Sequence, residues 1–381
     1  MIKGKQIEQR VSIDRPSVNY RKIDALNQSM IKLFDSDPVK FFEQFKLGKP
    51  RKDKKNTALT IGNLVDFYLL ECNANEDEFH NRFDEKFALF KGNKGSGQVF
   101  ILVDALFEET EGSINEEGIV TTSFMDRFTD AFNRVIGIKD GEGNQKYFKG
   151  KTIEKALEIF EKDGKEYFDT LMSNVGKTVV DTSLVDKAKI VANGILTDSF
   201  TRDLFYINDD IQVLPHFPIE WKYYIGEKNN KFIRCKSEID RLEINHANKT
   251  IQIDDLKTTY DNESFDYMYI KNSYYIQSAF YYLAVTFFRD NESDLKDYKI
   301  LPMRFIVGDT SSNNRRPVIF TTSIEDFKRG CEGFTLRGTY HRGIFELVDA
   351  ITWAEENDIW NCSKEVVEAN GKIKLNIKYE S

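Results

Sequence analysis

Two carboxylates and one ammonium group lie close together near the middle of this 381-residue chain. Asp240 ends one β-like run, and Asp255-Leu256-Lys257 ends the next, after a turn-rich connection. A hairpin of this kind brings the charged groups to one end of a sheet, with Asp255 and Lys257 on the same face. Carboxylates suit Mg²⁺ or Mn²⁺, and the backbone carbonyl of Leu256 could add a third oxygen. The chemistry would be metal-assisted hydrolysis of a phosphodiester, with Lys257 orienting the water or stabilising the developing negative charge.

The tripeptide Asp-x-Lys is not informative by itself, because the chain contains it elsewhere. Copies begin, for example, at Asp84, Asp294, Asp297 and Asp326, and the one at Asp294 repeats Asp-Leu-Lys. Those copies lie in polar segments that we expect to be helices or loops. Only Asp255–Lys257 ends a β-rich run and follows a second acid one hairpin upstream. The alternative for this copy is an ion pair at the exposed end of a strand.

A predicted helix after these strands, "SYYIQSAFYYLAVTFF", contains a polar residue in an apolar run. Its Gln277 and Tyr281 are four residues apart and therefore share one face of the helix. A buried glutamine needs a hydrogen-bond partner, and here this could be the lysine of the site or a phosphate. The alternative is a satisfied interior amide beside a core tyrosine.

Two further acids are candidate metal ligands. Asp66 is a single charge in the apolar helix predicted for 57–71, and buried charges are usually paired or bound to metal. Glu220 lies on the first predicted strand, beside Lys222. The alternatives are an outward-facing position for each side chain.

The elements around these residues predict an α/β protein. Helices are expected before residue 46, with a restart at Asp37-Pro38, and again over 57–71. A three-stranded meander over 216–226, 231–244 and 249–259 precedes the helix with Gln277. Two more strands ("ILPMRFIVGD" and "PVIFTTS"), helices over 324–356 and a small edge strand in the last residues follow. We divide the chain into a helical N-terminal region (1–86) that contributes to the core, a mainly helical insert or cap (87–210), the core itself (211–360) and a tail (361–381).

Composition narrows the choice of partners and compartment. The net charge is −8, so contacts with nucleic acid would depend on local basic patches such as Lys46–Lys55, Arg234 with Lys236, and Arg315-Arg316. The four cysteines are scattered, which favours a reduced, cytoplasmic protein, and no apolar run is long enough to cross a membrane. Two Gly-Lys-Thr tripeptides lack the spacing of a phosphate-binding loop, and the four histidines lack zinc spacing.

Together, "SEID", "DDLKTT" and "YYIQSAFYY" resemble the PD-(D/E)xK nuclease superfamily. The closest resemblance is to its RecB/RecE-type branch of phage exonucleases, which are similar to exodeoxyribonuclease VIII. "LNQSMIKLFDSDPVKFFEQF" and "IGNLVDFYLLE" resemble the N-terminal helices of that branch, whereas 87–210 match weakly. The chain departs from the pattern at Ile239, where the superfamily name has Pro, and at Asp66, where many relatives have His.

The resemblance implies a mixed-sheet core like that of restriction endonucleases, with helical additions. Asp240 and Asp255 would be metal ligands and Lys257 the catalytic lysine, with Gln277 and Tyr281 as the helix motif. Asp66 could keep a ligand role with altered metal preference. The implied activity is ATP-independent, Mg²⁺- or Mn²⁺-dependent exonuclease action on double-stranded DNA ends in phage-type recombination.

The resemblance also implies partners and a setting. These are a single-strand annealing protein, a homo-oligomeric ring, and the cytoplasm of a bacterial host carrying a phage or prophage. One alternative is a structure-specific or restriction-like endonuclease. The other, from a different class, is a non-catalytic DNA-binding accessory protein of recombination or packaging.

Overall fold

The computed structural model describes residues 20, 22–49, 57–92, 95–115, 117–205, 208–225, 231–311 and 315–373. The chain forms two compact units. One contains the described residues up to Ala74 and from Lys189 onward, and the other comprises Asn75–Ala188. The second unit shares 87–188 with the insert expected at 87–210. Most of the C-terminal edge strand expected at 371–381 lies outside the described residues.

The first unit is built on a six-stranded mixed sheet, so the protein is a mixed α/β protein. The strands are β3 (Ile211–Ile225), β4 (Lys231–Asn245), β5 (Thr250–Thr259), β6 (Lys299–Ile300), β7 (Arg304–Asp309) and β8 (Val318–Thr321). Their order is β3-β4-β5-β7-β8, and β6 also pairs with β5. Strands β6 and β7 pair with β5 in parallel, and the pairs β3–β4, β4–β5 and β7–β8 are antiparallel. The predicted meander and the two later strands are confirmed, although β3 begins five residues earlier than expected.

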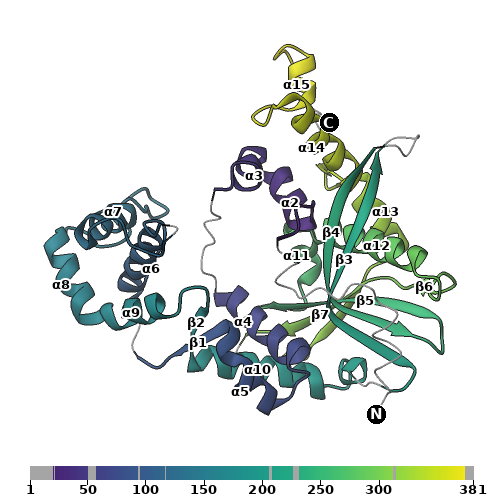
Figure 1. The fold of residues 1–381 in the computed structure, drawn as a ribbon, viewed down its shortest axis with the longest axis horizontal. Helices are drawn as coiled ribbons and strands as arrows, with labels where there is room; N and C mark the ends of the chain where they lie inside the picture. The colour runs from purple at the N-terminus through teal and green to yellow at the C-terminus, as the bar shows by residue number, and fades with distance from the viewer. Residues whose placement is uncertain are drawn as a thin grey trace. The chain divides into compact units, whose positions relative to one another are not determined.

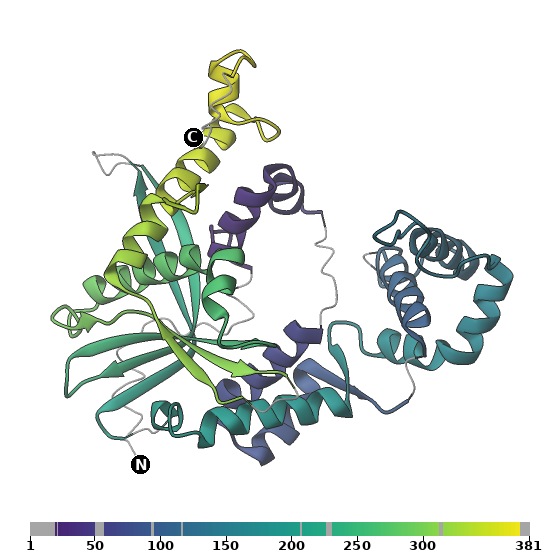
Figure 2. The ribbon, with the colours of Figure 1, turned by 180° about the vertical axis from the view of Figure 1, so that it is seen from behind.

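Strands β4 and β5 form a fork. Their pairing runs from Asn245 opposite Thr250 to Arg241 opposite Asp254 and ends there. Beyond this point β4 stays paired with β3, whereas β5 stays paired with β7 as far as Thr259. Figures 1 and 2 show β3 and β4 turning away from β5 and β7. The first residues beyond the last pair are Asp240 on β4 and Asp255 on β5.

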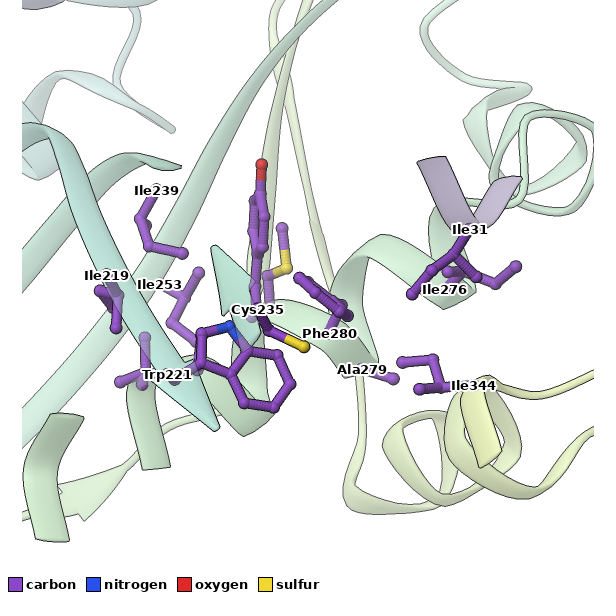
Figure 3. Packing of buried hydrophobic residues seen from close by; sticks show 14 of the residues in the cluster. Ile31, Ile219, Trp221, Cys235, Ile239, Ile253, Ile276, Ala279, Phe280 and Ile344 are labelled. Carbon is purple, nitrogen blue, oxygen red and sulfur yellow. The ribbon is translucent and has the colours of Figure 1, made fainter. Parts of the chain in front are cut away.

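Helix α12 (Tyr274–Asn291) is the centre of the hydrophobic core of this unit. It is apolar on nearly all sides, which is typical of a helix surrounded by other elements. Figure 3 shows its Phe280 beside Trp221 of β3, and the two rings meet edge to face with centroids 4.8 Å apart. Gly330 lets a neighbouring helix approach α12 closely, because an added Cβ would lie 2.5 Å from the Tyr275 carbonyl oxygen. The predicted buried helix is therefore confirmed.

Further helices complete the first unit. At the Asp37-Pro38 restart, the Asp37 side chain caps the second helix by accepting a hydrogen bond of 3.0 Å from the Lys40 N–H. The helices are α2 (Gln28–Ser36), α3 (Pro38–Phe45), α4 (Thr57–Asp66), α11 (Phe265–Lys271), α13 (Ile324–Glu332), α14 (Ile344–Asn357) and α15 (Lys364–Glu368). A π-helical turn η1 (Phe67–Glu71), a 3₁₀ turn η2 (Arg202–Phe205) and a hairpin of β9 (Phe334–Leu336) and β10 (Thr339–His341) also belong to it.

The second unit is mainly helical and has its own hydrophobic core. It contains α5 (Glu76–Lys86), α6 (Gly97–Glu111), α7 (Phe124–Ile136), α8 (Ile153–Asp163), α9 (Lys165–Ser173) and the start of α10 (Thr182–Thr197). The parallel pair β1 (Phe87–Phe90) and β2 (Thr178–Asp181) was not expected from the sequence. Among the described residues no helix is long and apolar enough to cross a membrane.

Candidate active site

The fork between β4 and β5 brings the two predicted metal ligands together. The Leu256 N–H donates a hydrogen bond of 3.2 Å to Oδ2 of Asp240, which ties the two strands together just past their last pair. Asp255 is completely buried. Burial and the negative charge of Asp255 hold the pKa of Asp240 well above its usual range. Two neighbouring carboxylates repel each other when both are ionised, and a bound cation would relieve that repulsion.

Lys257 pairs with the same carboxylate. Its Nζ forms an ion pair with Oδ2 of Asp255, and its side chain is 20% exposed. Burial acts to lower the pKa of Lys257, but the carboxylates of Asp255 and Asp240 outweigh it and raise that pKa above the ordinary value. The lysine is therefore fully charged at neutral pH. The ion pair considered as an alternative is therefore present, but it is not an exposed one, because Asp255 is completely buried.

Gln277 occupies the other oxygen of Asp255. Its Nε2 donates a hydrogen bond of 2.5 Å to Oδ1 of Asp255, and its side chain is buried. Tyr281 lies one turn further along α12, where burial and then the two acids raise the pKa of its hydroxyl, while a hydrogen bond with Gln277 acts against them. The helix motif thus fixes the position of Asp255. The sequence had suggested the lysine or a phosphate as the partner of Gln277.

The backbone of Leu256 is oriented so that its carbonyl oxygen could bind a metal ion. Its N–H points toward Asp240, and the N–H and C=O of one strand residue point to the same side. The β4–β5 ladder has already ended at Asp254, so no ladder bond from β4 is available to this carbonyl. The carbonyl oxygen of Leu256 is therefore available in the gap that Asp240 and Asp255 border.

A second group of possible ligands consists of Asp66, Glu71 and His216, whose donor atoms all lie within 4.8 Å of one another. Nε2 of His216 lies 3.0 Å from Oδ2 of Asp66 and 3.7 Å from Oε1 of Glu71. Burial acts to lower the pKa of His216, but the carboxylates of Asp66, Asp240 and Glu71 raise it to about 9. Nε2 is a buried atom, and among the residues that the structure describes it has no hydrogen bond of good geometry. It is thus available to a metal ion once deprotonated.

The π-helical turn η1 explains how Asp66 and Glu71 come together. Five residues apart on an α-helix, they would point about 140° away from each other. In a π turn the hydrogen bonds connect residues five apart, as in the 2.9 Å bond from the Cys72 N–H to the Phe67 carbonyl. The wider turn brings both acids to one side. Helix α4 also lies close to β5, because a Cβ on Gly62 would lie 3.2 Å from Thr258 Oγ1.

His216, which the sequence analysis did not identify as a ligand, lies across the β3–β4 hairpin from Asp240. Pro215 is opposite Arg241 and Phe217 is opposite Ile239, so the residue between them faces Asp240. His216 has a φ of +46°, an uncommon left-handed conformation for a histidine. A hairpin register that pairs Ile225 with Lys231 also places residue 216 opposite residue 240. That register was the signal available in the sequence.

Glu220 does not join either group. It is opposite Lys236 on β4, four residues along β3 from His216, which is about 13 Å in a strand. Its Oε2 lies 3.3 Å from Nη2 of Arg234. The predicted ligand role of Glu220 is therefore not supported by its position, and its place beside the site is taken by His216.

The basic patches proposed as contacts for nucleic acid are largely engaged within the protein. Arg234 contacts Glu220, and the buried Lys236 donates to the carbonyls of Tyr20 and Ile23. The remaining partners are Asp261 for Arg315, Asp198 for Arg316 and Glu355 for Lys46. Most of the Lys46–Lys55 patch lies outside the described residues. These patches therefore give little support to a DNA-binding surface.

The residues at the fork fit a hard divalent cation. Asp240, Asp255 and the Leu256 carbonyl offer only oxygen atoms, which Mg²⁺ and Mn²⁺ prefer. The group of Asp66, Glu71 and His216 offers two carboxylates and an imidazole, a mixture that also suits transition metals. Neither the models of known protein families nor the curated proteins contain a match to this chain.

Proposed function

We propose that this protein is a divalent-metal-dependent deoxyribonuclease with a PD-(D/E)xK-type core. The observation that carries the proposal is the surroundings of Asp255 at the fork. One oxygen of this carboxylate meets Lys257 and the other meets Gln277, while Asp240 lies across the gap. Four residues of the sequence pattern, contributed by β4, β5 and α12, thus lie next to one another. The β-β-β-α-β order, with β7 parallel to β5, supports the same core.

Each residue would have a distinct role in hydrolysis. Asp240, Asp255 and the Leu256 carbonyl would hold Mg²⁺ or Mn²⁺, which supplies charge neutralisation and a water of lowered pKa. Lys257 is charged and adjoins the acids, so it can orient the attacking water and stabilise charge on the phosphate oxygens. Gln277 keeps Asp255 in one rotamer, and Tyr281 keeps Gln277 in place. Asp66, Glu71 and His216 would form a neighbouring ligand group.

The more specific proposal rests on the resemblance of the motifs. It is an ATP-independent exonuclease that degrades one strand from duplex DNA ends and delivers the other to an annealing protein. A homo-oligomeric ring belongs to the same proposal. An endonuclease with this site would share the chemistry and differ in substrate, because it would cut closed circles. A non-catalytic DNA-binding protein would bind without hydrolysis.

The test is incubation of the protein with linear and covalently closed circular duplex DNA, in Mg²⁺, Mn²⁺ or EDTA. Metal-dependent loss of the linear DNA alone is expected, whereas cleavage of circles would favour the endonuclease. Absence of hydrolysis with both metals would reject both enzyme proposals. Lys257→Met should reduce the rate by about a hundredfold or more, the range found for removal of one stabilising group.

The chain offers a matched control for this substitution. Asp294-Leu295-Lys296 repeats the tripeptide of the site, and its lysine is exposed. Lys296→Met should therefore leave the rate unchanged. Equal loss of activity in both variants would mean that the site is elsewhere.

A further inference from the structure

A second lysine adjoins the fork. Lys32 lies on α2, between Ile31, which is completely buried in the core, and Leu33. Its Nζ is 5.0 Å from the centroid of the Tyr274 ring, and the Nζ of Lys257 is 5.1 Å from the same centroid. Two ammonium groups from distant parts of the sequence therefore share one aromatic ring. Nothing in the sequence marks Lys32 as part of the site.

The two lysines differ in what balances their charge. Lys257 has Asp255 as its ion-pair partner. For Lys32, no carboxylate oxygen of the described residues lies within ion-pair distance of Nζ. Burial and the charge of Lys257 lower the pKa of Lys32 to about 7, against a smaller attraction to Asp255. A partly buried cation that is repelled by its neighbour destabilises the fold, unless an anion from outside completes the arrangement.

The first turn of α12 adds to the positive character of this place. Tyr274 is the first residue of that 18-residue helix, and Gln277 in the same turn reaches Asp255. The N-terminal end of a helix carries partial positive charge and favours anions. Lys32, Lys257 and this helix end thus surround one ring, next to the acids that would hold a cation. Together these positive groups favour a ligand with several anionic oxygens.

We propose that Lys32 binds a non-bridging oxygen of the DNA phosphodiester that enters the site, as a substrate-positioning residue separate from Lys257. This inference rests on the proposed function and adds a second, N-terminal contact to it. The ligand is a backbone phosphate of DNA, and free phosphate is the alternative source of the same chemistry. The contact would form in the ground state, so its loss should weaken binding of DNA more than the rate of bond cleavage.

The experiment measures binding of a short blunt duplex to the full-length protein by fluorescence anisotropy. It uses Ca²⁺ in place of Mg²⁺, a range of salt concentrations and inorganic phosphate as competitor. Lys32→Met should weaken binding by about tenfold, as expected for a lost charge-assisted hydrogen bond. It should also reduce the slope of log K against log salt by about 0.9, the value for one phosphate contact. Lys32→Arg should retain most of the affinity. Lys40→Met, an exposed lysine on α3 paired with Asp37, is the control and should match wild type.

Thermal unfolding separates this role from a structural one. Lys32→Met removes a poorly balanced charge, so its melting temperature should equal or exceed that of wild type. A lower melting temperature with unchanged DNA affinity and salt slope would overturn the proposal. A further outcome is that millimolar phosphate competes in wild type but not in Lys32→Met, while the substitution leaves the DNA salt slope unchanged. That result would assign the site to free phosphate and would also overturn the proposal.

The same measurements distinguish the two proposals. Wild type that binds DNA through Lys32 and hydrolyses nothing would reject the nuclease and retain the phosphate contact. If wild type hydrolyses DNA and Lys32→Met binds DNA as tightly as wild type, the nuclease is retained and the phosphate contact is rejected. Wild type that does not bind DNA would overturn the contact, and the hydrolysis assay would decide the activity separately.

Discussion

Asp254 and Asp255 are neighbours on β5, yet their carboxylates have entirely different partners. Successive side chains of a strand point to opposite faces of the sheet. Asp254 accepts hydrogen bonds of 2.7 and 2.9 Å from Arg304 and also pairs with the buried Arg241. Asp255 pairs with Lys257 and Gln277. One acid therefore belongs to a buried ion-pair network, and the next to the candidate active site.

This division predicts different effects of two similar substitutions. Asp254→Asn should lower the free energy of unfolding by about 3–5 kcal/mol, because it leaves two arginines without their shared carboxylate. Asp255→Asn should abolish hydrolysis with a smaller loss of stability. Urea-induced unfolding measures the first effect, and Asp297→Asn at an exposed ion pair should change stability by about 1 kcal/mol or less. A larger loss for Asp255→Asn than for Asp254→Asn would contradict the assignment.

Cation binding at the fork should stabilise the protein. Because the pKa of Asp240 is raised by burial and by Asp255, adding Mg²⁺ or Mn²⁺ to protein in chelator should raise the melting temperature. At a hundredfold excess over the dissociation constant, the gain is about 2.7 kcal/mol. Asp240→Asn and Asp255→Asn should lose this gain, whereas Glu220→Gln should keep it. A metal response that depends on Glu220 would restore the ligand role that its position argues against.

The histidine beside Asp66 makes a testable contribution to pH dependence in EDTA. The pKa of His216 is raised from 6.5 to about 9 in the folded protein. Its charged form therefore adds stability that is complete below pH 6.5 and is lost as the pH rises through 9. The difference in unfolding free energy between wild type and His216→Gln should fall over this window, by an amount on the order of 3 kcal/mol. A difference that stays constant or grows with pH would show that Asp66, Glu71 and Asp240 do not act on the imidazole.

Gln277 should matter through Asp255. Gln277→Leu removes the donor to a completely buried carboxylate oxygen, so we expect about a tenfold to hundredfold loss of turnover, corresponding to 1.4–2.7 kcal/mol. Tyr281→Phe should have a smaller effect, because it removes only the group that holds Gln277. Single-turnover cleavage measures both. Equal activity of Gln277→Leu and wild type would place Gln277 among residues of the core alone.

The sequence was most informative where one local pattern decides the outcome. The strand-helix-strand order follows from periodicity, the fork acids from their spacing across one hairpin, and the Gln277–Tyr281 face from spacing within one helix. Glu71 was missed because only a π turn brings it beside Asp66, and the α-helical period gives no sign of that turn. His216 depends on the register of a hairpin, and Lys32 on the packing of α2 near α12. Such relations are set by tertiary structure rather than by local sequence.

The fork has a mechanical consequence. No ladder bonds cross the gap between β4 and β5 beyond Arg241 and Asp254, and the described contact across it is the 3.2 Å bond from Leu256 to Asp240. The spacing of β4 and β5 in the gap is therefore not fixed by ladder bonds, as it is between paired strands. Mg²⁺ requires oxygen distances of about 2.0–2.1 Å and Ca²⁺ about 2.3–2.6 Å. A cation held at the proposed site would then itself set the distance between the two strands, and we expect ions of different radius to set it differently.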